Sequence, residues 1–276
     1  MTEEPPVSEA PLLLAFDAST PLASVAVGRG DELLAQAYLV DPREQASRLV
    51  PTISAVLREA GVDRAQLGGI IVGKGAGSFT GVRIAAATAR GLAAGLGVPV
   101  WPCSSLAAAA VSAWVPAGLR GHLSWRFGSD APLEADPAAG VGAPLSSLPS
   151  AARDGPRYIL FDAGGDRVYA AAYRFSDGGI QTVLEPCAAT VGELLRLELA
   201  PDALFAGDGA LRHVRTLEAA GHSVLAFPAG VPTAAALLGL HRLRPVEAPE
   251  REGSRWQPDY LRGSSARPPR RMEGMS

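Results

Sequence analysis

Segments with strand character alternate with segments of helical spacing along this chain, and this order restricts the possible folds more than any other feature. Apolar runs bounded by turn residues predict strands at residues 12–16, 24–28, 33–40, 69–73 and 98–101. Apolar residues at helical spacing predict helices over residues 44–60, 81–96 and 104–114. Such alternation indicates an α/β protein in which helices pack on a mixed or parallel sheet.

The second half of the chain opens like the first, which makes a weak internal repeat. In each opening an apolar strand ends at an aspartate, Asp17 or Asp162, and a turn leads into a returning strand. Strands are expected at 158–161, 168–175 and 204–206, and a helix at 210–220. We therefore expect a disordered N-terminus (1–11), an N-terminal α/β half (12–117), a Gly/Pro/Ala-rich insertion or linker (118–156), a C-terminal α/β half (157–262) and a disordered tail (263–276).

Local signals predict how some helices begin. Asp41, Pro42 and Glu44 have the spacing of a helix start, with a capping box between Asp41 and Glu44. Pro51 lies within the helix that follows and is expected to kink or split it. Thr190 and Glu193 predict a second capping box in the other half of the chain.

Composition excludes several classes of protein. With 47% hydrophobic and 19% charged residues, the chain is not disordered throughout, and a net charge of −3 gives no global basic field for binding nucleic acid. Any RNA is therefore expected to be held by a partner. Two cysteines and four scattered histidines predict neither a disulfide framework nor a metal site. An acidic start and the absence of a long apolar run indicate a cytoplasmic protein without a membrane span.

The most conspicuous motif is a glycine-rich loop at residues 73–81. It departs from a P-loop because Gly75 stands where a serine or threonine should follow Lys74. It departs from a dinucleotide fingerprint because Thr80 occupies the third glycine position. Two interpretations stay open: a tight strand-to-helix turn that needs positive φ, or anion contact by amides at the next helix N-terminus.

The two strand-ending aspartates also allow two interpretations. In phosphotransferases built from two such halves, one acid orients magnesium or water while the turn amides hold phosphates. Alternatively, Asp17 and Asp162 simply accept hydrogen bonds from their own turns. Ser104 and Ser105, which precede the next helix, are interpreted as a helix cap, since no nucleophile elbow or nearby histidine accompanies them.

The helix at 81–96 is apolar on nearly all sides. One stripe contains Val82, Ala85, Ala86, Ala89, Leu92, Ala93 and Leu96, and the opposite side carries Ile84, Ala87, Thr88, Gly91, Ala94 and Gly95. Such a helix should be covered on nearly all sides, one of them by the sheet. The small residues suit close approach of another helix, either from this chain at 44–60 or from a second subunit.

Several runs together resemble the TsaB (YeaZ) family. They are residues 14–21 (LAFDASTP), 47–51 (SRLVP), 73–93 with the specific run GSFTGVR at 77–83, 98–100 (VPV), 104–106 (SSL), 162–170 and 258–262 (PDYLR). The resemblance is dense over 12–110 and patchy afterwards. It implies an actin-like, sugar-kinase-like (ASKHA) fold of two duplicated α/β halves with helices on mixed sheets.

The resemblance also implies a role. In the family, a related subunit, TsaD, transfers threonylcarbamoyl to the tRNA adenosine beside the anticodon, using a metal held by two histidines. Those positions fall on Ser105 and Ala109 here, so the chain resembles a non-catalytic paralogue without a metal or cofactor. The glycine and aspartate loops would be vestigial phosphate loops, formed by Asp17, Ser19, Thr20, Gly75, Gly77, Ser78 and Thr80.

The resemblance implies partners as well. A TsaD-like catalytic subunit would bind the helices at 44–60 and 81–96, a TsaE-like ATPase would join them, and the chain alone could form a homodimer; tRNA would be reached only through the complex. The expected partner interface comprises Leu49, Ile53, Val56, Ile84, Ala87, Thr88, Gly91 and Gly95.

The sequence departs from the family where Gln45 or Ala46 stands in place of a frequent histidine, and where residues 164–166 lack an expected arginine. Two alternatives remain. One is an actin-type ATPase or small-molecule kinase that uses Asp17, the loop at 75–80 and residues 207–209. The other is a glycoprotease-like peptidase, against which the missing ligand pair argues.

Overall fold

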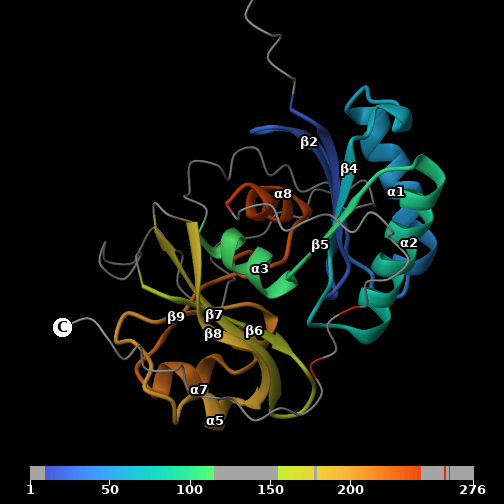
Figure 1. Ribbon diagram of the computed structural model, residues 1–276. Helices are drawn as coiled ribbons and strands as arrows, with labels where there is room; N and C mark the ends of the chain where they lie inside the picture. Colours follow the sequence, from blue (N-terminus) through green and yellow to red (C-terminus); the bar gives the residue numbers. More distant parts are fainter. Residues whose placement is uncertain (1–9, 115–154, 177–178, 244–257, 259–260, 262–276) are drawn as a thin grey trace, which may run out of the picture.

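Two five-stranded mixed sheets form the frame of the molecule. The computed structural model describes residues 10–114, 155–176, 179–243, 258 and 261. The first sheet has the order β3-β2-β1-β4-β5 (Figure 1), and β4 and β5 run parallel to β1, whereas β2 is antiparallel to both of its neighbours. Its strands are β1 (Leu12–Asp17), β2 (Ala23–Arg29), β3 (Glu32–Leu39), β4 (Gly69–Gly73) and β5 (Val100–Cys103).

The second sheet repeats this plan. Its order is β10-β9-β6-β7-β8, which is the first order read from the other side, and each strand has the direction of its counterpart. The strands are β6 (Arg157–Asp162), β7 (Arg167–Ser176), β8 (Gly179–Thr190), β9 (Leu204–Ala206) and β10 (Ser223–Val224). The expected duplicated α/β fold is therefore confirmed.

The helices form three layers around the two sheets. The outer face of the first sheet is covered by α1 (Gln45–Glu59) and α2 (Phe79–Leu96), with a short 3-10 turn η1 (Arg64–Gln66) nearby. The outer face of the second carries α5 (Val191–Leu194), α6 (Asp208–Arg212) and α7 (Val214–Ala219). Between the sheets lie α3 (Ser105–Trp114) and α8 (Ala234–Leu243), as Figure 1 shows.

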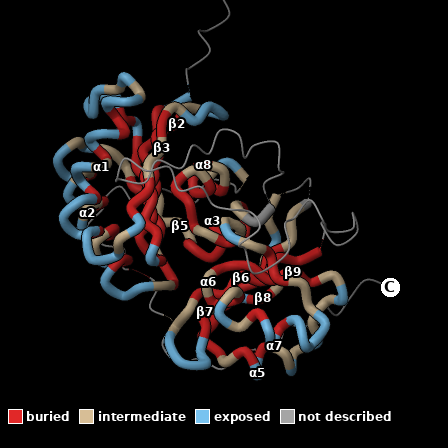
Figure 2. The backbone as a smooth tube through the Cα atoms, turned by 180° about the vertical axis from the view of Figure 1, so that it is seen from behind, coloured by how far each residue is buried: buried red, intermediate tan, exposed pale blue. Residues whose placement is uncertain are grey.

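The alternation of side chains along each central strand separates the cores. In β1, Leu12, Leu14 and Phe16 pack under α1 and α2, whereas Leu13 and Ala15 face the middle layer. In the same way β6 divides its residues between the middle layer and the outer helices. Every residue of β1 is buried, and the exposed residues concentrate on the outer helices and turns (Figure 2). Both faces of each sheet are therefore covered by helices.

Each half contributes its last helix to the other half. The helix α3 follows the first sheet but packs on β6 and β7, and α8 follows the second sheet but packs on β1, β2 and β4. The backbone N–H of Ala234, at the start of α8, donates to Ser24 Oγ on β2 at 2.8 Å. The division at residue 157 is thus a division of the sequence, while the two lobes interlock in space.

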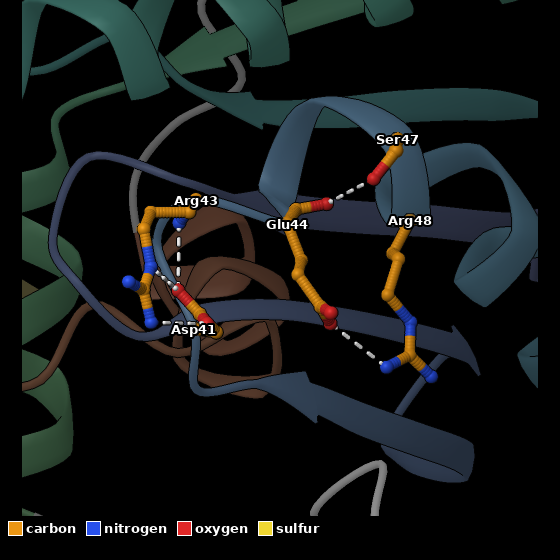
Figure 3. Close-up of polar contacts among 5 residues, drawn as sticks. All are labelled: Asp41, Arg43, Glu44, Ser47 and Arg48. Carbon is orange, nitrogen blue, oxygen red and sulfur yellow. Dashed lines mark hydrogen bonds and ion pairs between the residues drawn. The ribbon is translucent and has the colours of Figure 1, made fainter.

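The start of α1 lies later than predicted. Asp41 accepts hydrogen bonds from the backbone N–H of Arg43 at 2.9 Å and from its guanidinium at 3.1 Å, so residues 41–44 form a turn (Figure 3). Glu44 occupies the N-cap position without a side-chain cap and pairs instead with Arg48 at 2.9 Å. Asp41 therefore does not cap the helix, because its carboxylate is occupied by its own turn.

The other helix predictions have mixed outcomes. Pro51 does not interrupt α1. Proline has no N–H to donate to the carbonyl of Ser47, one turn earlier, and both residues are exposed to solvent. The capping box of Thr190 and Glu193 is confirmed. The helix predicted at 210–220 is divided into α6 and α7 at His213, and α8 was not predicted.

Several expectations concern residues outside the described part of the chain. Residues 1–9, most of the 118–156 segment and residues 263–276 are among them. Within the described residues, no helix combines the length and the apolar character needed to cross a bilayer.

Because the lobes interlock through α8, shortening a buried side chain of this helix should strongly reduce the stability of the protein. Leu237 is fully buried in the middle layer, so Leu237→Ala should lower the free energy of unfolding by about 2–5 kcal/mol. Leu33→Ala, at a side chain 36% exposed on the edge strand β3, should lower it by less than about 1 kcal/mol. Urea denaturation followed by circular dichroism measures both. Equal losses in the two variants would contradict a structural role of α8 between the sheets.

Candidate functional site: a buried aspartate turn and a two-helix surface

The turn after β1 is organised by a carboxylate that has no contact with solvent. Asp17 is fully buried, and its Oδ1 accepts hydrogen bonds from the backbone N–H and the Oγ of Ser19, at 2.7 and 2.6 Å. Its Oδ2 accepts from Ser105 Oγ, at the start of α3, at 2.6 Å. Three donors of the chain itself therefore occupy Asp17. The two bonds from Ser19 agree with the interpretation in which Asp17 accepts hydrogen bonds from its own turn.

The glycine-rich loop closes on the same turn. The backbone N–H of Ser78 donates to the Ser19 carbonyl at 2.6 Å, and a Cβ on Gly77, whose φ is +142°, would lie 2.1 Å from that oxygen. Gly75, with φ of +98°, donates its N–H to Ser105 Oγ at 3.1 Å and accepts from the Ser105 N–H at 2.9 Å. The interpretation as a tight strand-to-helix turn with positive φ is confirmed.

This packing uses donors that a phosphate would need. The N–H groups of Ser19, Gly75 and Ser78 bind acceptors within the chain, and the N–H of Gly81 donates to Ser78 Oγ, the side-chain cap of α2, at 3.2 Å. Of the seven predicted phosphate-loop residues, Asp17, Ser19, Gly75, Gly77 and Ser78 come together. The other two make different contacts: Thr20 donates its hydroxyl to the Leu22 carbonyl at 3.0 Å, and Thr80 is exposed in the first turn of α2.

Burial dominates the electrostatics of this turn. Desolvation raises the pKa of Asp17 above its usual value of 3.8, and the hydrogen bonds from Ser105 and Ser19 oppose that rise. The carboxylate thus joins the turn after β1 to the start of α3, and Ser105 connects it to the glycine-rich loop.

The aspartate turn of the second half has a different environment. Asp162 accepts from the N–H of Gly164 at 2.9 Å, which matches the bond from Ser19 to Asp17, and its other oxygen pairs with Arg212. Asp208 Oδ1 accepts from the N–H groups of Asp162 and Gly209 at 3.2 and 2.9 Å. Desolvation raises the pKa of Asp208. Among the described residues, Asp17 and Asp162 share no hydrogen-bond partner.

The positions implied for metal ligands lie in the protein interior. Ser105 is fully buried in the Asp17 network, and Ala109, one helical turn later, is fully buried in the middle core. The cap expected here comes from Ser104, whose Oγ accepts from the N–H of Ala107 at 3.3 Å. In the part of the chain that the structure describes, no three His, Cys, Asp or Glu side chains gather to hold a metal ion.

The expected interface residues divide into two groups. Ala87, Gly91 and Gly95 are exposed on α2, and Ile84 and Thr88 are half-buried beside them. Leu49, Ile53 and Val56 are at most 3% exposed and pack under α1 in the chain's own core, so their assignment to a partner interface is wrong. The physical reason is that the single apolar stripe of α1 is needed to cover the sheet.

A solvent-facing surface nevertheless spans both helices. On α1 the side chain of Val50 is 49% exposed, and Ala46 is exposed one turn earlier. We call the solvent-facing sides of these two helices the α1/α2 surface; it comprises Ala46, Val50, Ile84, Ala87, Thr88, Gly91 and Gly95. The two helices are in contact and lie side by side on the first sheet (Figure 1).

The repeated sheet order with two exchanged helices defines a duplicated α/β protein of the actin-like, sugar-kinase-like class. A solved Pseudomonas aeruginosa structure, described as an uncharacterized protein with similarity to peptidase YeaZ, is 28% identical with a TM-score of 0.69, and the match covers 91% of this chain and all of that one. A second, YeaZ from the same organism, has 26% identity, a TM-score of 0.64 and the same coverage. The chain is thus similar in sequence and in fold to YeaZ proteins.

The curated sequence relatives match a little more than a third of this chain. The tRNA threonylcarbamoyladenosine biosynthesis protein TsaB of Haemophilus influenzae is 41% identical over 107 residues, 37% of this chain and 43% of that protein. Its Escherichia coli namesake is 36% identical over 102 residues, 37% and 44% of the two chains. The chain thus spans less than half of the length of these curated relatives. A family model described as TsaD, tRNA N6-adenosine threonylcarbamoyltransferase, matches residues 40–120.

The raised pKa of Asp17 predicts a pH-dependent difference between the wild type and Asp17→Asn. A pKa above the unfolded value means that the folded state binds the proton more tightly, so this contribution to stability is lost as pH rises. Asparagine does not titrate. The difference in free energy of unfolding should therefore shift in favour of Asp17→Asn between about pH 4 and about pH 7. Urea denaturation at both pH values tests this, and a shift in favour of the wild type would show that the three donors outweigh burial.

Proposed function

We propose that this chain is a non-catalytic subunit that binds and activates a TsaD-like catalytic subunit in the addition of threonylcarbamoyl to the tRNA adenosine beside the anticodon. The proposal rests on the similarity to TsaB proteins and, as its single structural observation, on the α1/α2 surface. Helix α2 is apolar on the side that covers the sheet and carries small or apolar residues on the solvent side as well. An outward stripe of Ile84, Ala87, Thr88 and Gly91 permits close approach of a partner helix.

The contacts around Ser105 support the non-catalytic part of the proposal. A metal-dependent transferase needs ligands with an open coordination position. Here one of the two implied positions is a serine bound to Asp17, and the other is an alanine packed among apolar side chains. The same contacts weigh against an actin-type ATPase or kinase, because Asp17 and the amides of Ser19, Gly75 and Ser78 are already bound within the chain.

The remaining partners follow from the same proposal. A TsaE-like ATPase would join the heterodimer, tRNA would be bound through the complex because the chain carries a net charge of −3, and a homodimer would form through the α1/α2 surface when the catalytic subunit is absent. The reaction that this complex serves would take place in the cytoplasm.

An added charge on the α1/α2 surface should weaken the heterodimer. Ala87→Glu places a carboxylate where the partner would desolvate it, so the affinity for a TsaD-like subunit should fall by about tenfold or more. Ala219→Glu is the matched control, since Ala219 is also an exposed alanine of a helix but lies on α7 in the other lobe. Sedimentation velocity of mixtures measures the affinity, and circular dichroism verifies that both variants fold.

The outcomes separate three cases. Loss of binding in both variants, or in neither, would contradict the use of this surface. Absence of any heterodimer with the wild type, together with tRNA modification that proceeds without this chain, would contradict the proposed function. Unfolding of Ala87→Glu would assign that face to the chain's own core.

Nucleotide binding tests the alternative enzyme. Because the turn amides are bound within the chain, calorimetry should detect no magnesium-dependent ATP binding at millimolar nucleotide. ATP binding that disappears in Asp17→Ala but persists in Ala219→Glu would favour the ATPase or kinase instead.

A further inference from the structure

The two helices of the α1/α2 surface begin against one turn, residues 17–21. At the start of α2, the N–H of its cap residue Ser78 donates to the Ser19 carbonyl at 2.6 Å. Gly81, in the first turn of α2, lies so close that a Cβ there would be 1.8 Å from the Ala18 carbonyl oxygen. The backbone of residues 18 and 19 therefore fixes where α2 begins.

The same turn holds the start of α1 through a buried side chain. Gln45, the first residue of α1, is 2% exposed, and its Nε2 donates to the carbonyls of Thr20 and Pro21, at 3.1 Å each. Its Oε1 would lie 3.2 Å from a Cβ on Gly81. Gln45 thus stands where α1, α2 and the turn meet, and four successive carbonyls of residues 18–21 face the two helix starts.

The shape of the turn is set from its other side. Asp17 holds Ser19 through two hydrogen bonds, and Ser105 joins Asp17 to Gly75 in the loop that leads into α2. Because Ser105 begins α3, which packs on β6 and β7, this network also connects the helix starts to the second lobe. No residue of the network belongs to the exposed α1/α2 surface itself.

We infer that Gln45, Asp17 and Ser105 are positioning residues for the partner surface: they fix α1 relative to α2 so that both helices fit one catalytic subunit. The inference rests on the proposed function, since it concerns the surface that binds the TsaD-like subunit. Each residue is at most 2% exposed and acts through the helix starts without touching the partner. Asp17, a residue of the expected phosphate loops, would thus help to order a surface that recognises a protein.

The test separates positioning from contact by kinetics. Gln45→Met keeps most of the side-chain volume and removes the two donors, and Ser105→Ala is a second variant that removes the bridge to Asp17. With fewer molecules holding the two helices in the competent arrangement, association with the TsaD-like subunit should slow by about fivefold to tenfold, while the dissociation rate stays within about twofold. Thr190→Ala is the control: it removes a helix cap in the other lobe and so reports whether a general loss of stability slows association.

Surface plasmon resonance gives both rate constants, and amide hydrogen exchange of the free chain gives an independent readout. Exchange should accelerate in the first turns of α1 and α2 in Gln45→Met and Ser105→Ala, and not in Thr190→Ala. Unchanged association in both network variants overturns the inference, as does an effect confined to the dissociation rate, which would mean direct contact. If the wild type binds no TsaD-like subunit, the proposed function fails, and the exchange pattern still tests the positioning role.

Discussion

The fold of this protein depends on a buried carboxylate that receives all of its hydrogen bonds from the chain itself. Asp17 collects donors from Ser19, two residues away, and from Ser105, 88 residues away. An unpaired acid in such a place would be strongly destabilising, so the turn, the glycine-rich loop and the start of α3 must form together. A turn that resembles a phosphate loop thus joins three segments of the chain: the end of β1, the glycine-rich loop and the start of α3.

The two halves use the same local device with different results. In both, an aspartate at the end of a central strand accepts from the N–H of the residue two positions later. In the first half the loop before α2 packs directly on that turn, with Gly77 against the Ser19 carbonyl. In the second half Gly164 and Gly165 are exposed, and Asp162 turns to Arg212. Duplication thus preserved the backbone plan while the surroundings of the two turns diverged.

Local and periodic signals in the sequence were sufficient for much of the fold. The strand at 69–73, the strand at 204–206 and the capping box at Thr190 depend on neighbouring residues, and they agree with the structure. The start of α1 was mispredicted because the Asp41 carboxylate prefers its own turn, which a spacing rule does not distinguish from a cap. The role of Ser105 could not be predicted, since its partners Asp17 and Gly75 lie far away in the sequence. Leu49, Ile53 and Val56 were assigned to a partner because an apolar stripe has the same pattern whether it covers a sheet or another subunit.

The exchange of α3 and α8 between the lobes has a consequence for the order of folding during synthesis. The inner face of the first sheet, with Leu13, Ala15 and Ile71, is covered by a helix that begins only at residue 234. The first lobe leaves the ribosome before α8 has been made, so this apolar face stays open until residues 234–243 have been synthesised. The nascent chain therefore exposes an apolar surface until α8 is synthesised, and chaperones are expected to bind the chain mainly before that point.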